Sequence, residues 1–82
     1  MKQLPDLKQL LLDLSRAIVD IPDEVTVEQA EEDDTVIFTV RVAEEDMGKI
    51  IGRHGKNARC IRTIMKAAGT NCGLRVVVDI AE

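Results

Sequence analysis

Aromatic residues and cysteines are scarce in this sequence. Phe38 is the one aromatic residue among 82, and there is no tryptophan or tyrosine. A core made from these residues must therefore be aliphatic, with Phe38 inside it. The two cysteines, Cys60 and Cys72, form no CxxC motif and have no histidine at metal-ligand spacing. We interpret both as free and reduced, rather than as a disulfide or a metal site. We expect no metal and no cofactor.

Long apolar runs are also missing. Leu10-Leu11-Leu12 lies in a short segment flanked by charges, far below the roughly 20 apolar residues of a membrane span. We see no secretory leader and expect a cytoplasmic domain that does not contact a membrane. The length suits a single domain, residues 1–82, with one core.

Groups for catalysis are scarce as well. With His54 as the sole histidine, no Ser-His-Asp or Cys-His arrangement can be assembled, and there is no Walker A lysine. The acidic run 31–34 is typical of a hairpin turn rather than of metal ligands. We therefore expect no catalytic residues, no small-molecule substrate and no enzyme activity.

Charge of one sign predominates in each half of the chain. The net charge is −4, but residues 1–46 hold 4 basic and 13 acidic side chains, whereas residues 47–82 hold 7 basic and 2 acidic. From Met47 to Lys66 there are six basic residues and no acidic one. This asymmetry predicts a local positive surface on an acidic protein.

Hydrophobic periodicity predicts three helices and three strands. Pro5 suits the first turn of the first helix, and Gly69 is expected to end the last. The acidic residues at 44–46 favour a helix start, because the helix dipole favours negative charge there. The expected elements are a helix at 5–20, a strand at 24–30, a turn at 31–34, a strand at 35–42, a short helix ending near 51, a helix at 56–68, a turn at 70–73 and a strand at 74–80.

The order of these elements predicts an α+β fold. A short turn makes the first two strands antiparallel, and a right-handed crossover through two helices makes the second and third parallel. We expect a three-stranded mixed sheet with helices on one face. The alternation places Phe38 and its i±2 neighbours in the core. Residues expected to face the core are Val36, Phe38, Val40 and Val42 of the second strand, Ile61, Ile64, Met65 and Ala68 of the long helix, and Leu74, Val76, Val78 and Ile80 of the last strand.

A Gly-x-x-Gly loop at residues 52–55 joins the two later helices. Glycine at both ends permits a tight backbone and a close approach by a ligand. The N–H groups that open the next helix are free donors, and the helix dipole attracts an anion. With Lys49, Arg53, Lys56 and Arg59 around it, the loop is expected to bind phosphate.

This arrangement resembles a type II KH domain, with the order α-β-β-α-α-β. Over nearly its full length the chain resembles the small bacterial single-KH family known as KhpA, or YlqC-like. Two departures from the family pattern are Glu44, where relatives often have proline, and Ala58, where a larger aliphatic residue is common. The resemblance rests on the segments 20–23, 43–56, 61–64 and 76–80.

The resemblance implies binding of short single-stranded RNA, about four nucleotides at a time. Without exposed aromatic side chains, base stacking of the RRM kind is excluded. We interpret the chain as a non-catalytic RNA chaperone or post-transcriptional regulator. The alternative is a protein-interaction module of KH fold with little RNA affinity. The expected RNA-binding residues are Lys49, Ile51, Gly52, Arg53, His54, Gly55, Lys56, Ala58, Arg59 and Arg62.

Members of that family also form pairs, which implies a homodimer or a heterodimer with a larger Jag-type KH protein. On the long helix, Cys60, Ile64 and Ala67 form an apolar flank beside the core stripe, and we prefer this surface for pairing. Ile37 and Val77 are a second apolar patch, expected on the uncovered face of the sheet.

Overall fold

The computed structural model describes residues 6–81. Helices and strands follow one another in the expected order, and short 3₁₀ turns lie at Pro22–Glu24, Glu44–Asp46 and Arg53–Gly55. The elements are α1 (Leu7–Arg16), β1 (Thr26–Glu32), β2 (Thr35–Arg41), α2 (Met47–Ile51), α3 (Lys56–Asn71) and β3 (Arg75–Ile80).

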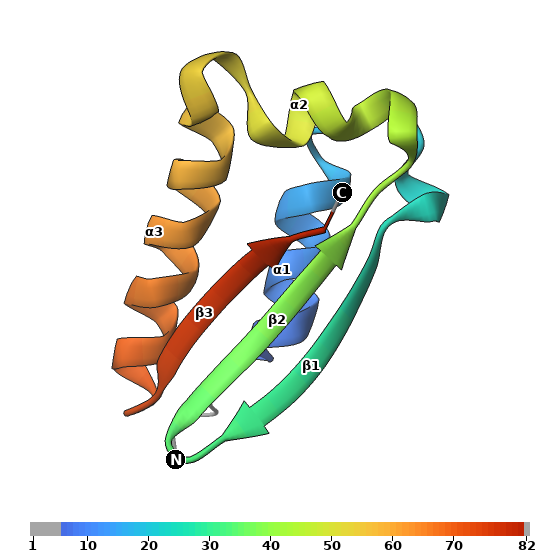
Figure 1. The fold of residues 1–82 in the computed structure, drawn as a ribbon. Coiled ribbons are helices and arrows are strands. Elements are labelled where there is room, and N and C mark those ends of the chain that lie inside the picture. Colours follow the sequence, from blue (N-terminus) through green and yellow to red (C-terminus); the bar gives the residue numbers. More distant parts are fainter. Residues whose placement is uncertain (1–5, 82) are drawn as a thin grey trace.

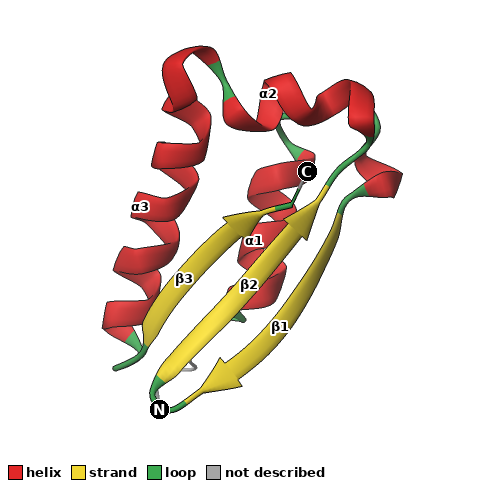
Figure 2. Cartoon of the chain, in the orientation of Figure 1, coloured by secondary structure: helices red, strands yellow, loops and turns green. Residues whose placement is uncertain are grey.

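A three-stranded sheet in the order β1-β2-β3 is backed by two helices (Figures 1 and 2). β1 pairs with β2 antiparallel, and β2 pairs with β3 parallel. α1 and α3 lie behind the sheet, while α2 crosses the end at which β2 and β3 finish (Figure 1). The predicted α+β architecture, with a mixed sheet and helices on one face, is confirmed.

The core lies between the sheet and the helices. Phe38 is 1% exposed, and it packs with Leu11, Ile50 and Met65 in one aliphatic cluster. Val36 and Val40 are buried on the same face of β2 as Phe38, so the predicted alternation of this strand is confirmed. Val78 of β3 faces the same core.

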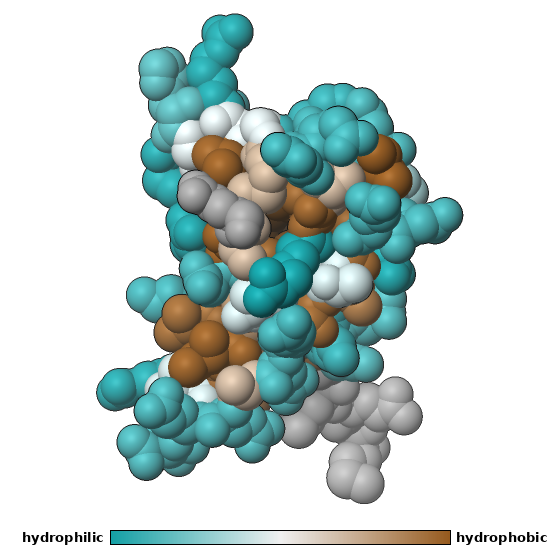
Figure 3. All heavy atoms as spheres, turned by 45° about the vertical axis from the view of Figure 1, so that its right-hand side comes forward, coloured by the Kyte–Doolittle hydropathy of each residue, from teal (hydrophilic) through white to brown (hydrophobic). Residues whose placement is uncertain are grey.

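Within residues 6–81, no helix covers the opposite face of the sheet (Figure 1). Ala30 of β1 pairs with Ile37 of β2, and Ile37 pairs with Val77 of β3, which makes one apolar row across the face. Val77 is 48% exposed, as the sequence predicts for an uncovered face. In Figure 3 the strands carry a brown area low on the visible side.

Both ends of α1 differ from the prediction. The helix begins at Leu7, because the Asp6 carboxylate accepts a hydrogen bond from the Gln9 N–H at 3.1 Å and caps it. It ends at Arg16, four residues before the expected end at 20. The expected role of Pro5 falls outside the described residues.

The hairpin is tighter than predicted. β1 runs on to Glu32 and β2 starts at Thr35, so the turn contains Asp33 and Asp34 alone, rather than the four acidic residues. Asp33 has a φ of 55°, a left-handed conformation that aspartate tolerates better than most residues. β1 thus begins and ends about two residues later than the strand at 24–30 that its hydrophobic pattern predicts.

The end of α3 was also predicted wrongly. The helix continues through Gly69 to Asn71. Gly69 is buried, and a Cβ added to it would lie 2.4 Å from Cγ2 of Val76. The glycine thus lets α3 pack closely on β3 and does not end the helix. The residues of α3 that the core buries are Ala58, Ile61, Met65 and Gly69.

Two residues expected in the core are exposed. Ile64 of α3 is 44% exposed and Leu74, just before β3, is 38% exposed. In α3 the buried stripe shifts toward Ala58 and Gly69, which leaves Ile64 at its edge. None of the helices between residues 6 and 81 is both long and apolar enough to cross a membrane.

Candidate nucleic-acid interface

The loop between α2 and α3 has a fixed, unusual backbone. Gly52 has φ 78° and ψ 172°, a conformation open almost only to glycine. His54 and Gly55 follow in the left-handed region, with φ of 56° and 74°. The Gly52 N–H donates to the Gly48 carbonyl at 2.9 Å and the Gly55 N–H to the Gly52 carbonyl at 3.1 Å. The loop is therefore a compact turn.

Asn57 explains why position 52 needs glycine. A Cβ on Gly52 would lie 2.7 Å from Cγ and 2.8 Å from the backbone N of Asn57. The Asn57 side-chain amide donates to the Lys49 carbonyl at 2.8 Å, so it ties the last turn of α2 to the start of α3. Sequence reasoning missed Asn57. The sequence feature that could have indicated this role is an amide side chain directly after the loop, which can donate to an unsatisfied carbonyl at the end of the preceding helix.

Arg59 supports the other end of the loop. Its Nη1 donates to the His54 carbonyl at 2.6 Å and would lie 3.4 Å from a Cβ on Gly55. Arg59 is nonetheless exposed. It therefore combines two properties, a charge near the loop and a bond that holds the loop in shape.

The outer side of the loop carries only basic and neutral side chains. Arg53, His54 and Lys56 are all exposed. Within residues 6–81, the N–H groups of Arg53 and His54 have no backbone or side-chain acceptor, whereas the N–H of Lys56 donates to the Arg53 carbonyl. The loop thus combines two N–H donors that have no acceptor among residues 6–81 with the exposed cations Arg53 and Lys56.

Lys49 lies beside the loop, but it has an acidic partner. Its ammonium pairs with the Asp20 carboxylate in the segment after α1. The hydrogen bond to Asp20 raises the pKa of Lys49 above its usual value of 10.5. Desolvation opposes this rise, and the charges of Asp20 and Asp46 add to it. Among the cations that the sequence places in the site, Lys49 is thus the one whose charge is most neutralised by an acidic partner.

Asp46 has a different role from the one its position predicts. It is 2% exposed, and its carboxylate accepts from the N–H groups of Asp20 at 3.1 Å and Ile21 at 2.9 Å. It makes no capping bond to α2. The buried carboxylate therefore fastens the 20–21 segment to the start of α2, and that segment in turn holds Asp20 next to Lys49.

Arg62 points away from the loop. Its Nε donates to the Val78 carbonyl of β3 at 3.3 Å. Lys66 is farther along α3, where it lines a hollow of about 320 Å³ with Thr70, Leu74 and Arg75. The basic residues of α3 therefore divide, with Lys56 and Arg59 near the loop and Arg62 at the edge of the sheet.

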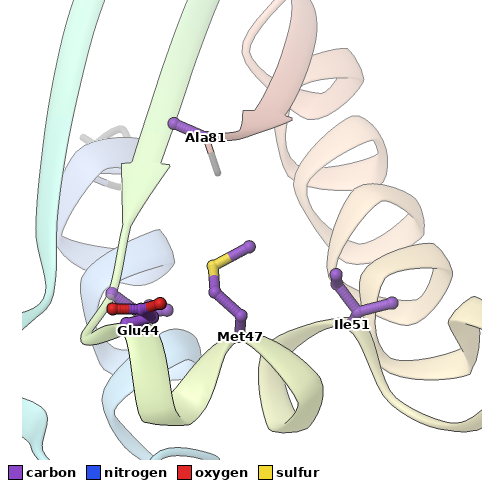
Figure 4. A pocket seen from close by; sticks show the side chains of 5 residues that line it. Glu44, Met47, Ile51 and Ala81 are labelled. Carbon is purple, nitrogen blue, oxygen red and sulfur yellow. The ribbon is translucent and has the colours of Figure 1, made fainter.

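The apolar residues expected in the site differ in burial. Ile51 is half-buried and lines a hollow between α2 and the ends of β2 and β3 (Figure 4), whereas Ala58 is 4% exposed and belongs to the core. In Figure 4, Met47 and Ile51 rise from α2 toward Ala81. The hollow has a volume of about 450 Å³ and is lined by Val42, Glu44, Met47, Ile51 and Ala81.

The outer flank of α3 carries a second hollow of about 450 Å³. Cys60 and Ile64 lie in it beside Lys56 and Arg59. Cys60, Ile64 and Ala67 are all exposed, so the apolar flank predicted for pairing is present on the surface. Both cysteines are free. Between residues 6 and 81, no three His, Cys, Asp or Glu side chains are grouped as a metal site would require.

The fold and the loop together define a KH domain of type II, since a Gly-x-x-Gly loop joins two helices that lead from one strand to its parallel neighbour. Comparison with known proteins agrees. The family model described as "KhpA/KhpB, KH domain" matches residues 8–80. The chain belongs to this family.

Relatives with similar length support the assignment. The chain is 46% identical to "RNA-binding protein KhpA" of Clostridium acetobutylicum over 74 residues, which cover 90% of this chain and 99% of the relative. The protein of the same name from Aquifex aeolicus is 39% identical over 82 residues and matches along the whole of both chains.

One solved structure shows the same fold in a larger protein. A crystal structure of an Aquifex aeolicus Era variant bound to GDP and aluminium fluoride superposes with a TM-score of 0.65 at 15% identity. The match covers 96% of this chain and 31% of that one. This likeness concerns the fold alone.

Proposed function

We propose that the chain is a non-catalytic RNA-binding protein that clamps a short single strand against the loop 52–55. It acts as an RNA chaperone or a post-transcriptional regulator. Its relatives carry the name RNA-binding protein, and KH loops clamp about four backbone nucleotides. Arg53, His54 and Lys56 contact the phosphates, and Arg59 adds charge and holds the loop.

One observation carries this proposal. The loop presents the free N–H groups of Arg53 and His54 beside exposed cations, in a stretch from 47 to 66 that contains no acidic residue. Backbone donors at the start of a helix, together with nearby cations, are suited to phosphate oxygens. An ordinary solvated helix face carries both signs of charge, so the absence of acidic residues from this stretch favours an anionic ligand.

The hollow beside α2 supplies the apolar half of the site. Ile51 directly precedes Gly52, so a strand whose phosphates lie on the loop has its bases within reach of Ile51 and Met47. Bases are planar and partly apolar, and single-stranded RNA is recognised with its bases splayed out. The backbone therefore lies on the loop, and the bases turn toward the hollow.

The double substitution Arg53→Asp with His54→Asp tests the clamp. Two carboxylates at the free N–H groups repel phosphate, so affinity for a labelled octacytidylate should fall at least about tenfold. Both side chains are exposed, so the fold should be retained. The matched control is Lys8→Asp with Gln29→Asp, two exposed positions outside the loop that change the net charge equally. If both double variants bind RNA equally well, the clamp is wrong.

The exposed apolar residues Ile64 and Val77 favour a second candidate, a protein-interaction module with little RNA affinity. Salt dependence separates the two functions. Binding through phosphates weakens linearly on a log–log plot of affinity against salt, with a slope of about −0.7 for each phosphate neutralised on a single strand. A flat plot would favour the protein-interaction function.

We also propose that the chain acts as a homodimer, or as a heterodimer with a larger Jag-type KH protein, through the α3 flank of Cys60, Ile64 and Ala67. Paired sites raise the effective concentration of each short contact. Ala67→Glu should leave the protein folded and lower its sedimenting mass at tens of micromolar. Ala17→Glu changes another exposed alanine, at the end of a helix, and should leave that mass unchanged. A monomeric parent that also ignores KH partners would refute pairing.

A further inference from the structure

Glu44 is the one charged side chain among the five that line the hollow beside α2. The other four, Val42, Met47, Ile51 and Ala81, are apolar. In Figure 4 Glu44 lies at one side of Met47 and Ile51 at the other, so the carboxylate and the loop are at opposite ends of the hollow. Figure 3 shows brown atoms around this region at the α2 end of the sheet.

The two ends of the hollow therefore differ in charge. The loop end has Arg53 and Lys56, and the far end has Glu44, with Glu45 next to it in the chain. A carboxylate repels phosphate, so the RNA backbone is excluded from the far end. What can reach Glu44 across the apolar lining is the edge of a base.

An ionised carboxylate can only accept hydrogen bonds. Cytosine presents its N4 amino group to such an acceptor, and a carboxylate is a known partner of that group. Uracil has the acceptor O4 at the same position, which a carboxylate repels. Adenine, with an amino group at N6, resembles cytosine in this respect.

We propose that Glu44 determines base preference in this protein, by favouring a base with an exocyclic amino group over uracil in the hollow beside α2. This inference rests on the proposed function, because it requires RNA on the adjacent loop.

The test compares octacytidylate with octauridylate in fluorescence anisotropy at fixed salt. The parent should bind octacytidylate about five- to tenfold more tightly, which corresponds to one good base contact. Glu44→Gln keeps the size of the side chain and adds a donor for O4, so the ratio should fall to about one, mainly because octauridylate binds better.

Glu45→Gln is the matched control. It removes the same charge from the same exposed turn, but Glu45 does not line the hollow. Both variants should bind every RNA somewhat more tightly, since each removes one negative charge, and only Glu44→Gln should change the ratio.

The outcomes distinguish this inference from the proposed function. Equal affinities of the parent for the two oligonucleotides, or an unchanged ratio in Glu44→Gln, would overturn the role of Glu44 while RNA binding stands. A ratio that falls equally in both variants would mean a general charge effect and would also overturn it. If neither oligonucleotide binds the parent, the proposed function fails, and this inference fails with it.

Discussion

Two pairs of cations in the basic stretch from 47 to 66 look alike in the sequence and differ in the structure. The outward pair, Arg53 and Lys56, is exposed and makes no side-chain ion pair or hydrogen bond within residues 6–81. The inward pair, Lys49 and Arg62, is bound to the Asp20 carboxylate and the Val78 carbonyl. A run of basic residues is thus not one surface. Some of its members shape the site, and others are left to face a ligand.

Among the substitutions considered, replacement of Gly52 should have the largest effect on stability and RNA binding. Gly52→Ala places a Cβ against Asn57 and strains a backbone with φ of 78°. We expect a loss of about 1–3 kcal/mol in the free energy of unfolding, and RNA binding that is nearly abolished because the loop must change shape. Urea denaturation and anisotropy measure the two effects.

Gly48→Ala is the matched control for this change. A Cβ there meets nothing within 4 Å, and Gly48 lies inside α2. Alanine should therefore leave RNA binding intact and stabilise the fold by about 0.5–1 kcal/mol. Equal behaviour of the two alanine variants would contradict the account of the loop.

Asn57→Ala separates the shape of the loop from its charge. It removes the hydrogen bond to the Lys49 carbonyl, at a cost of about 1 kcal/mol in stability. Affinity should fall several-fold while the salt slope stays the same, because no charge changes. A reduced slope would mean that Asn57 acts through the phosphate contacts themselves.

Lys56→Met and Lys49→Met compare the outward and inward pairs directly. Lys56→Met should weaken binding to all RNA sequences about equally and reduce the salt slope by about 0.7. Lys49→Met should reduce it by much less, because Asp20 already neutralises that ammonium. If both reduce the slope equally, the ion pair opens when RNA binds and the distinction is lost.

The smallest expected effect is a pH dependence of the stability of the fold. Because the pKa of Lys49 is raised in the folded state, the pair with Asp20 contributes its full stability below 10.5 and loses it as pH rises through the folded-state pKa. The parent should lose slightly more stability than Asp20→Asn when urea midpoints are compared below and above pH 10.5. An identical loss in both proteins would show that the pair does not contribute.

Local patterns sufficed for the order of the elements and for the position of the loop. Alternation placed Phe38 in the core, and the Gly-x-x-Gly spacing placed the turn between α2 and α3. These features depend on neighbours in the sequence, where periodicity and glycine are informative.

Features that depend on distant residues were missed. Gly69 leaves room for Val76 inside the helix, and the buried Asp46 accepts hydrogen bonds from the N–H groups of Asp20 and Ile21. The bond of Arg62 to Val78 is of the same kind. No single-sequence pattern reports such contacts, and those of Lys49 and Arg62 distinguish these two cations from Arg53 and Lys56.

The most direct test of the central claim is to titrate the ¹⁵N-labelled protein with octacytidylate and follow its backbone amide signals. The account predicts that the largest shifts occur from Gly52 to Asn57, with Arg53 and His54 foremost, since their N–H groups are free to bind phosphate. Tight binding with shifts confined to Ile37 and Val77 on the open face of the sheet, and none in the loop, would contradict it.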